Sequence, residues 1–139
     1  MSAPAKSSAG LHLRLLAMLY DALVILAMWI LTLVVLVAAT GAAVTGFWVQ
    51  VLLLAEAYAF FLFFWTRRGQ TLGMLAWRLR VTDGNAPIGL RQAHLRIAGG
   101  ILSLACLGLG HAWMLFDRQG RTWPDILSAS SIERTGAKR

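Results

Sequence analysis

The longest stretch without a charged side chain runs from Ala22 to Ala55, and it limits how this chain can fold. Its 34 residues exceed the roughly 20 that an α-helix needs to cross the hydrocarbon core of a bilayer. The whole chain has 139 residues, of which 58% are apolar and only 14% are charged. A globule of this size could hardly enclose so long an apolar run, so the sequence predicts an integral membrane protein.

Two membrane-spanning helices are expected within and around this run. The first covers Leu11 to Ala39 and the second covers Phe47 to Thr66. Thr40 to Gly46 is small and uncharged and is typical of a tight connection. Trp48 and Trp65 lie near the ends of the second helix, where aromatic rings favour the headgroup region. The main element of this all-α membrane protein is therefore predicted to be an antiparallel transmembrane hairpin.

The basic residues flank the apolar segments, which predicts an orientation. The net charge is +7, and eleven of the thirteen cations are arginines. Beside membrane spans these favour anionic lipid headgroups as partners rather than nucleic acid. Residues 41–46 hold no cation, whereas Lys6 and Arg14 precede the first span and six arginines follow the second: Arg67, Arg68, Arg78, Arg80, Arg91 and Arg96. We expect a multi-pass protein of a bacterial-type inner membrane with its N-terminus in the cytoplasm and no cleaved signal peptide.

A third apolar stretch, Ile97 to Phe116, has the length of a span but conflicts with this orientation. A crossing would place five cations outside the cell: Arg118, Arg121, Arg134, Lys138 and Arg139. The triplet from Gly108 to Gly110 could turn the chain near the middle of the stretch. Backbone turns at membrane depth occur where protein or water satisfies the polar groups. A re-entrant helical hairpin is therefore favoured over a third span.

A small cytoplasmic β element is predicted between the second and third apolar stretches. Residues 78–82 alternate like a strand and end in the turn signal of residues 83–85. Ser128 to Glu133 is the later segment able to pair with this strand, which requires both to lie on one face of the membrane. Gln70 to Trp77 is expected to form a short interfacial helix capped by Thr71.

Two acids lie within the predicted spans, Asp21 and Glu56. Intramembrane carboxylates are costly and mark functional sites by default. Folding the hairpin about residue 43 places Asp21 level with Trp65 and Glu56 roughly 13 Å deeper. A staggered pair suits a proton or cation relay. The competing interpretation is structural, with Asp21 salt-bridged to an arginine of the loop and Glu56 protonated and hydrogen-bonded.

Arg14 lies two helical turns before Asp21, on the same helix face and about 10 Å away along the axis. This separation is too large for a direct ion pair. Arg14 is therefore expected to meet another acid or a phosphate headgroup.

The sequence contains no pattern typical of an enzyme or of a metal or cofactor site. Cys106 lies in an apolar stretch, and His12, His94 and His111 are dispersed without metal-ligand spacing. Nucleophile elbows, phosphate-binding Gly-rich loops and zinc signatures do not occur. Asp117 and Asp125 flank two arginines and form a further polar cluster. We expect a protein without enzymatic activity; an enzyme acting on lipid headgroups is the most distant alternative.

Three segments in this order resemble the RDD family, named for one arginine and two aspartates. They are residues 14–21, residues 67–83 and the closing Arg121-Thr122-Trp123-Pro124-Asp125. The resemblance implies that Arg14, Asp21 and Asp125 are the signature residues of a membrane domain over residues 11–133. The family often has His and Lys where this chain has Pro124 and Met74, so roles of those side chains do not transfer. A disordered tail, residues 1–10, and a basic tail, residues 134–139, flank the domain.

Two functions follow as hypotheses. The resemblance implies a suspected transport role, including cation/proton exchange. The position of Glu56 within a span makes it a further candidate for a proton or cation site. Two spans cannot easily enclose a path alone, so a homo-oligomer is expected, with small residues such as Ala38 and Gly41 allowing close helix approach. The alternative is a membrane scaffold or assembly partner that transports nothing.

Overall fold

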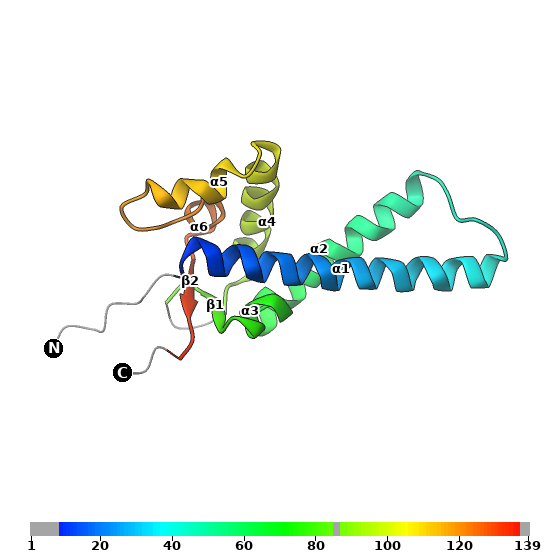
Figure 1. The fold of residues 1–139 in the computed structure, drawn as a ribbon, viewed down its shortest axis with the longest axis horizontal. Helices are drawn as coiled ribbons and strands as arrows, with labels where there is room; N and C mark the ends of the chain where they lie inside the picture. The colour runs from blue at the N-terminus through cyan, green and yellow to red at the C-terminus, as the bar shows by residue number, and fades with distance from the viewer. Residues whose placement is uncertain (1–8, 85–86, 137–139) are drawn as a thin grey trace.

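A computed structural model of the chain describes residues 9–84 and 87–136. Two long helices extend from a body of shorter elements (Figure 1). The elements in order are α1 (Leu11–Thr40), α2 (Phe47–Arg67), α3 (Leu72–Ala76), β1 (Leu79–Thr82), α4 (Leu90–Ala105), α5 (Leu109–Ala112), the 3-10 helix η1 (Trp113–Leu115), α6 (Trp123–Ser128) and β2 (Ser131–Arg134). The predicted class, a helical membrane fold with a small β element, is confirmed.

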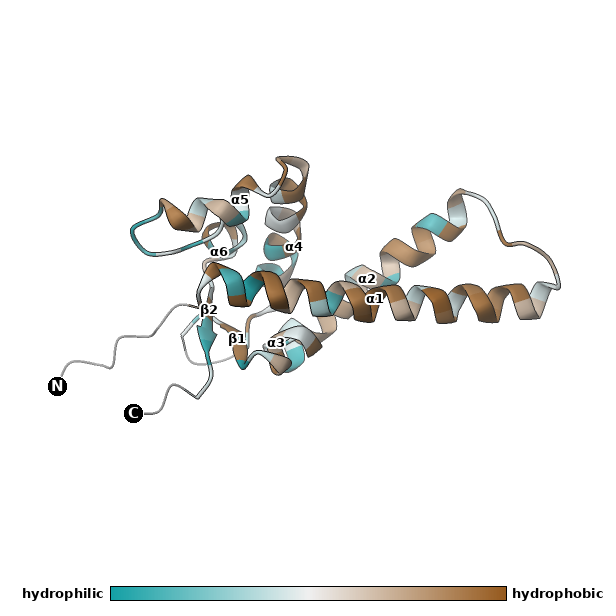
Figure 2. Ribbon diagram, viewed as in Figure 1, coloured by the Kyte–Doolittle hydropathy of each residue, from teal (hydrophilic) through white to brown (hydrophobic). Residues whose placement is uncertain are grey.

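Helices α1 and α2 are the two elements long and apolar enough to cross a membrane within the described residues. Their bounds agree with the predicted spans to within one residue. Most of their apolar side chains are exposed, and hydrophobic residues line both helices along most of their length (Figure 2). Surface of this kind is unfavourable in water and is expected where lipid is the solvent.

The two helices meet near their middles and diverge towards the connecting loop (Figure 1). At the meeting point the indole Nε1 of Trp29 donates to the carbonyl oxygen of Leu53 at 2.8 Å. Gly41 ends α1 with a left-handed φ of 67°, a conformation that glycine adopts at little cost. The rest of the loop extends between separated helix ends instead of closing the tight connection expected from its composition.

The third apolar stretch bends near its middle, at the turn that the sequence predicted around Gly108, while the choice between a re-entrant hairpin and a span stays a prediction. The chain leaves α4 through Leu107 and Gly108, both with positive φ, and the following α5–η1 segment is bent by 107° relative to α4. Helix α4 runs across the direction of α1 rather than along it (Figure 1). The strands that flank the stretch pair with each other, so it begins and ends at the same part of the molecule.

Strands β1 and β2 form an antiparallel pair in which Leu79 faces Arg134 and Thr82 faces Ser131. The predicted pairing is confirmed, but the second strand begins three residues later than expected because Ser128 still belongs to α6. The turn after β1 was predicted to include Asn85, which lies outside the described residues.

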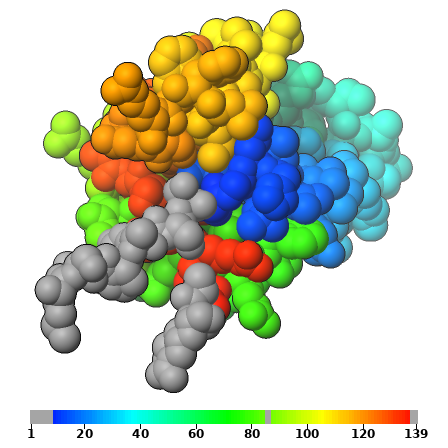
Figure 3. Space-filling model, turned by 60° about the vertical axis from the view of Figure 1, so that its left-hand side comes forward, coloured from blue at the N-terminus to red at the C-terminus, as the bar shows by residue number. Residues whose placement is uncertain are grey.

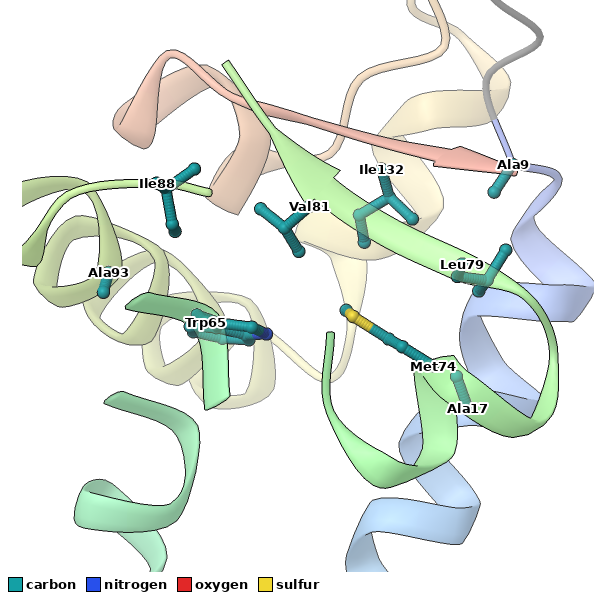
Figure 4. Close-up of a cluster of buried hydrophobic side chains, with 9 residues drawn as sticks. All are labelled: Ala9, Ala17, Trp65, Met74, Leu79, Val81, Ile88, Ala93 and Ile132. Atoms are coloured by element: carbon teal, nitrogen blue, oxygen red, sulfur yellow. The ribbon is translucent and has the colours of Figure 1, made fainter. Parts of the chain in front are cut away.

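A hydrophobic core joins the short elements at one end of the hairpin. Leu79 and Val81 of β1 are fully buried in it, between the start of α1 and the end of α2 (Figure 4). Ala9 belongs to this core and its N–H donates to Ile132 at 3.1 Å, so the ordered domain includes residues assigned to the N-terminal tail. Arg134 likewise ends β2, and residues 1–8 and 137–139 lie outside the described part.

Helix α3 packs on α1 through Gly73, where a Cβ atom would collide with the backbone oxygen of Ala17. Gly73→Ala should therefore lower the free energy of unfolding by about 3 kcal/mol, the upper part of the range for overpacking, because backbone cannot move aside easily. Thermal unfolding of the purified protein in detergent measures the effect. Gly100→Ala is the matched control, since a Cβ there meets no atom within 4 Å. Equal stability of the two variants would show that α3 does not pack on α1 in this way.

Candidate functional site

Asp125 is placed by the start of α6. Thr122 is the N-cap, and its Oγ1 accepts from the N–H of Asp125 at 3.4 Å. In return the Asp125 carboxylate accepts from the N–H of Thr122 at 3.1 Å, which completes a capping box. Pro124 occupies the first turn, where its missing N–H costs nothing. The local sequence thus orients the Asp125 carboxylate into the protein, where it is fully buried.

Two arginines from distant parts of the chain bind this one carboxylate. Arg14 Nη1 lies 2.5 Å from Asp125 Oδ2, and Arg96 Nη1 lies 2.8 Å from Oδ1. Both guanidinium groups are 3% exposed. The cluster joins α1, α4 and α6, and Figure 3 shows the start of α1 lodged between the α5–η1 region and β2. We call Arg14, Arg96 and Asp125 the arginine–aspartate cluster.

Neutral groups complete the surroundings of the cluster. Arg14 Nε donates to the carbonyl oxygen of Ala9 at 3.0 Å, and Arg96 Nη1 also donates to Ser130 Oγ at 2.8 Å. The Arg96 guanidinium lies 5.3 Å from the centre of the Trp65 ring, within the range of a cation–π interaction. With two arginines and one carboxylate, the cluster itself has one excess positive charge.

Burial alone raises the pKa of Asp125, but the positive charges of Arg96 and Arg14 and the hydrogen bonds to its oxygens outweigh this effect. The pKa of the Asp125 carboxyl therefore lies below its ordinary value, and the group is ionised at neutral pH. Removal of one partner from a buried ion pair strongly destabilises the protein, because the remaining charge is then buried without compensation.

Asp21 caps the next short helix instead of meeting an arginine. Its Oδ2 accepts from the Thr71 hydroxyl at 2.5 Å and its Oδ1 from the N–H of Gly73 at 2.8 Å. Thr71 Oγ1 in turn accepts from the N–H of Met74, so the predicted cap is confirmed. The expected salt bridge between Asp21 and a loop arginine is wrong. Helix α3 packs closely against α1, so the Thr71 hydroxyl and the Gly73 N–H are the donors that bind the Asp21 carboxylate. The expectation that Arg14 meets another acid is confirmed.

Glu56 lies where α1 and α2 meet. Thr32 Oγ1 donates to its Oε1 at 2.7 Å, while Oε2 is buried and has no hydrogen-bond partner among residues 9–84 and 87–136. Thr32 follows Asp21 by eleven residues, which is about 16 Å along a helix. The two intramembrane acids are therefore staggered, as predicted.

A cavity of about 200 Å³ lies between α1, α2 and α4. Its lining brings together Arg14 and Asp21 from one face of α1, with Asp125 directly behind Arg14. Arg96 and His111 also line it, and His111 Nδ1 is hydrogen-bonded to Ser103 Oγ at 2.6 Å. The remaining walls are almost entirely apolar.

Arg96 is the site residue that sequence reasoning missed, since it was counted only as a basic residue of the cytoplasmic side. A signal exists in the buried face of α4, where Ala93, Arg96, Gly99 and Ser103 recur at helical spacing. Small side chains on one face predict close packing, and an arginine among them requires a buried acid as partner. Gly99 bears this out, since a Cβ there would lie 2.8 Å from Pro124 Cα on α6.

Asp117 and Arg121, which the sequence grouped with Asp125, form a separate ion pair. Arg121 pairs with Asp117 at 3.1 Å in a surface contact four residues apart. Within the described ranges, no group of three His, Cys, Asp or Glu side chains is placed to hold a metal ion.

The RDD family model matches residues 8–129, which is most of the chain. This protein belongs to the RDD family. No curated protein and no solved structure matches it. With its two apolar helices, membership of the family identifies an integral membrane protein.

Both departures from the RDD pattern have a structural account. Met74 stands where a lysine is common and is buried in the hydrophobic core beside Leu79 (Figure 4). Pro124 stands where a histidine is common and packs against Gly99. Both side chains are apolar, so neither supplies the charge that a lysine or histidine would bring to its position.

Replacing the RDD aspartate Asp125 by Asn should destabilise the protein by about 3–5 kcal/mol, because two buried guanidinium groups lose their counter-charge. The contribution of Asp125 to the free energy of unfolding should also depend on pH. Because the pKa of Asp125 is lowered by folding, its contribution is complete above the ordinary carboxyl pKa and is lost as pH falls through the lower folded value.

Thermal unfolding in detergent at a series of acidic pH values checks both points. The stability difference between wild type and Asp125→Asn should shrink as pH falls. Asp117→Asn is the control, since its surface ion pair should contribute much less. A difference that stays constant over this pH range would contradict the assigned ionisation of Asp125.

Proposed function

We propose that this RDD protein is a proton- or cation-translocating module of the membrane, with Glu56 as the group that binds and releases the ion. The observation that carries the proposal is the free carboxylate oxygen Oε2 of Glu56, buried between two apolar spans. A charged carboxylate is costly at membrane depth unless a proton or cation compensates it. The Thr32 hydroxyl holds the other oxygen and fixes the orientation of the group.

The other acids are less suited to this role because their oxygens already have partners. Both oxygens of Asp125 bind arginines, and both oxygens of Asp21 bind donors at the start of α3. Asp21 borders the cavity, so it is the second group that an ion could visit. In this proposal Asp21 serves the cytoplasmic end of the relay and Glu56 its middle.

A translocation path would be completed by further copies of the chain. The two spans of one copy diverge, and their exposed residues are apolar along most of their length. A continuous polar path needs walls on every side. We therefore propose a homo-oligomer in which the Glu56 groups of neighbouring copies border one path.

Ion flux into proteoliposomes that contain only the purified protein tests the proposal. We expect pH-gradient-dependent flux of protons or of a monovalent cation, and at least about tenfold slower flux for Glu56→Gln, which keeps the shape and removes the charge. Gln50→Glu is the control variant. It lies six residues nearer the loop on α2 and tests whether a carboxylate at another position of the span alters the flux. Equal flux from wild type and Glu56→Gln, or none from either, would exclude the proposed role.

The alternative of a scaffold that transports nothing is favoured by one observation: Arg14, Asp21 and Asp125 all bind groups of their own chain. A scaffold would show no flux and would co-purify with a stable partner. It would also keep its function in Glu56→Gln.

We further propose that the N-terminus is cytoplasmic and that the membrane is the inner membrane of a bacterial cell, in support of which the cations follow the positive-inside pattern. Single cysteines in a Cys106→Ser background test the orientation. Ala43→Cys should react with a membrane-impermeant maleimide in intact cells, and Gln119→Cys should react only after permeabilisation. The reverse result would show the opposite orientation, and labelling of both in intact cells would show that the third apolar segment crosses the membrane.

A further inference from the structure

The cavity between α1, α2 and α4 opens onto the same apolar surface as the spans. Its lining includes Met18, Ile101 and Leu104, which are 37%, 63% and 66% exposed. Its volume of about 200 Å³ is below the roughly 300–1,000 Å³ of sites that enclose a whole small molecule. An occupant would therefore place only part of itself inside and the rest along the exposed apolar rim.

Two hydrogen-bond donors that belong to residues of the cavity wall lack acceptors. Arg96 Nε and Trp65 Nε1 are both buried and have no hydrogen-bond partner in the described part of the chain. Arg96 is 3% exposed, and its guanidinium lies against the Trp65 ring. Buried donors without acceptors are rare in native structures and each costs stability.

The other polar groups of the wall do not supply the missing acceptor. Both oxygens of Asp21 already accept from Thr71 and Gly73, and the ring of His111 is bonded to Ser103. The charged groups at the cavity are Arg14 and Arg96 on one side and Asp125 and Asp21 on the other, and the free donors belong to Arg96 and Trp65. The unmet requirement of the cavity is thus for an acceptor, and a charged acceptor makes the strongest hydrogen bond to a guanidinium group.

We propose that this cavity binds a single-chain anionic amphiphile, such as a fatty-acid carboxylate. The acid group accepts from Arg96 and Trp65, and the alkyl chain lies along Ile101 and Leu104 towards the lipid. An inorganic anion would leave the apolar walls unfilled, and a neutral lipid would offer Arg96 no charged acceptor. Glu56 does not line this cavity, so binding of the amphiphile can be tested separately from the proposed role of Glu56.

Quenching of tryptophan fluorescence by a terminally brominated undecanoate tests the site, because Trp65 lines the cavity. The protein is held in nanodiscs of phosphatidylcholine, and the brominated undecanol of equal length is titrated in parallel. We expect saturable quenching by the acid and at least about tenfold weaker binding of the alcohol, since only the acid makes charge-assisted hydrogen bonds.

Gly100→Leu adds a side chain to the wall of the cavity, where a Cβ meets no atom within 4 Å. It should abolish the saturable quenching, whereas Ala98→Leu, on an exposed part of the same helix, should leave it unchanged. Equal quenching by acid and alcohol, or unaltered binding in Gly100→Leu, would overturn the proposal. Displacement of the acid by millimolar inorganic phosphate would also overturn it, because the site would then recognise charge without the chain.

Discussion

A single buried carboxylate, Asp125, is bound by two arginines that lie 82 residues apart in the sequence, and the body of the protein depends on that contact. Arg14 belongs to α1, Arg96 to α4 and Asp125 to α6, the short helix before β2. Packing of apolar groups is a weak organiser where lipid surrounds the protein, because lipid tails are as apolar as the side chains. A desolvated ion pair, by contrast, is highly specific in its geometry, and any wrong partner leaves a buried charge unmatched.

The hydrogen bonds of Asp21 have a similar role. Asp21 holds the start of α3 against α1, and Gly73 permits the approach that brings its N–H to the carboxylate. The short elements thus close around one end of the hairpin, while the spans beyond them make few contacts with each other. Glu56 lies outside this framework, and its hydrogen-bond partner among the described residues is Thr32. For this reason we propose that Arg14, Asp21 and Asp125 hold the fold together and that Glu56 binds the ion.

The spans, the Thr71 cap and the strand pair could be predicted from sequence because each depends on a local pattern: a charge-free run, a capping residue or a period of two. The partners of the acids could not be predicted with the same success. The pairing of Arg96 with Asp125 depends on the turn at Gly108, which decides that α4 and α6 lie together. The partners of Asp21 are the Thr71 hydroxyl and the Gly73 N–H, and a backbone N–H is offered by every residue except proline. The divergence of α1 and α2 has no local signal either, since both helices are apolar on all sides.

A double-mutant cycle on Arg96 and Asp125 tests most directly whether the ion pair organises the fold. The free energies of unfolding of Arg96→Gln, Asp125→Asn and the double variant would be measured in detergent near neutral pH. If the two groups are bound as described, the double variant should be less destabilised than the sum of the single variants by more than about 1 kcal/mol. Additivity within about 0.5 kcal/mol would mean that the two residues act independently and would contradict the account.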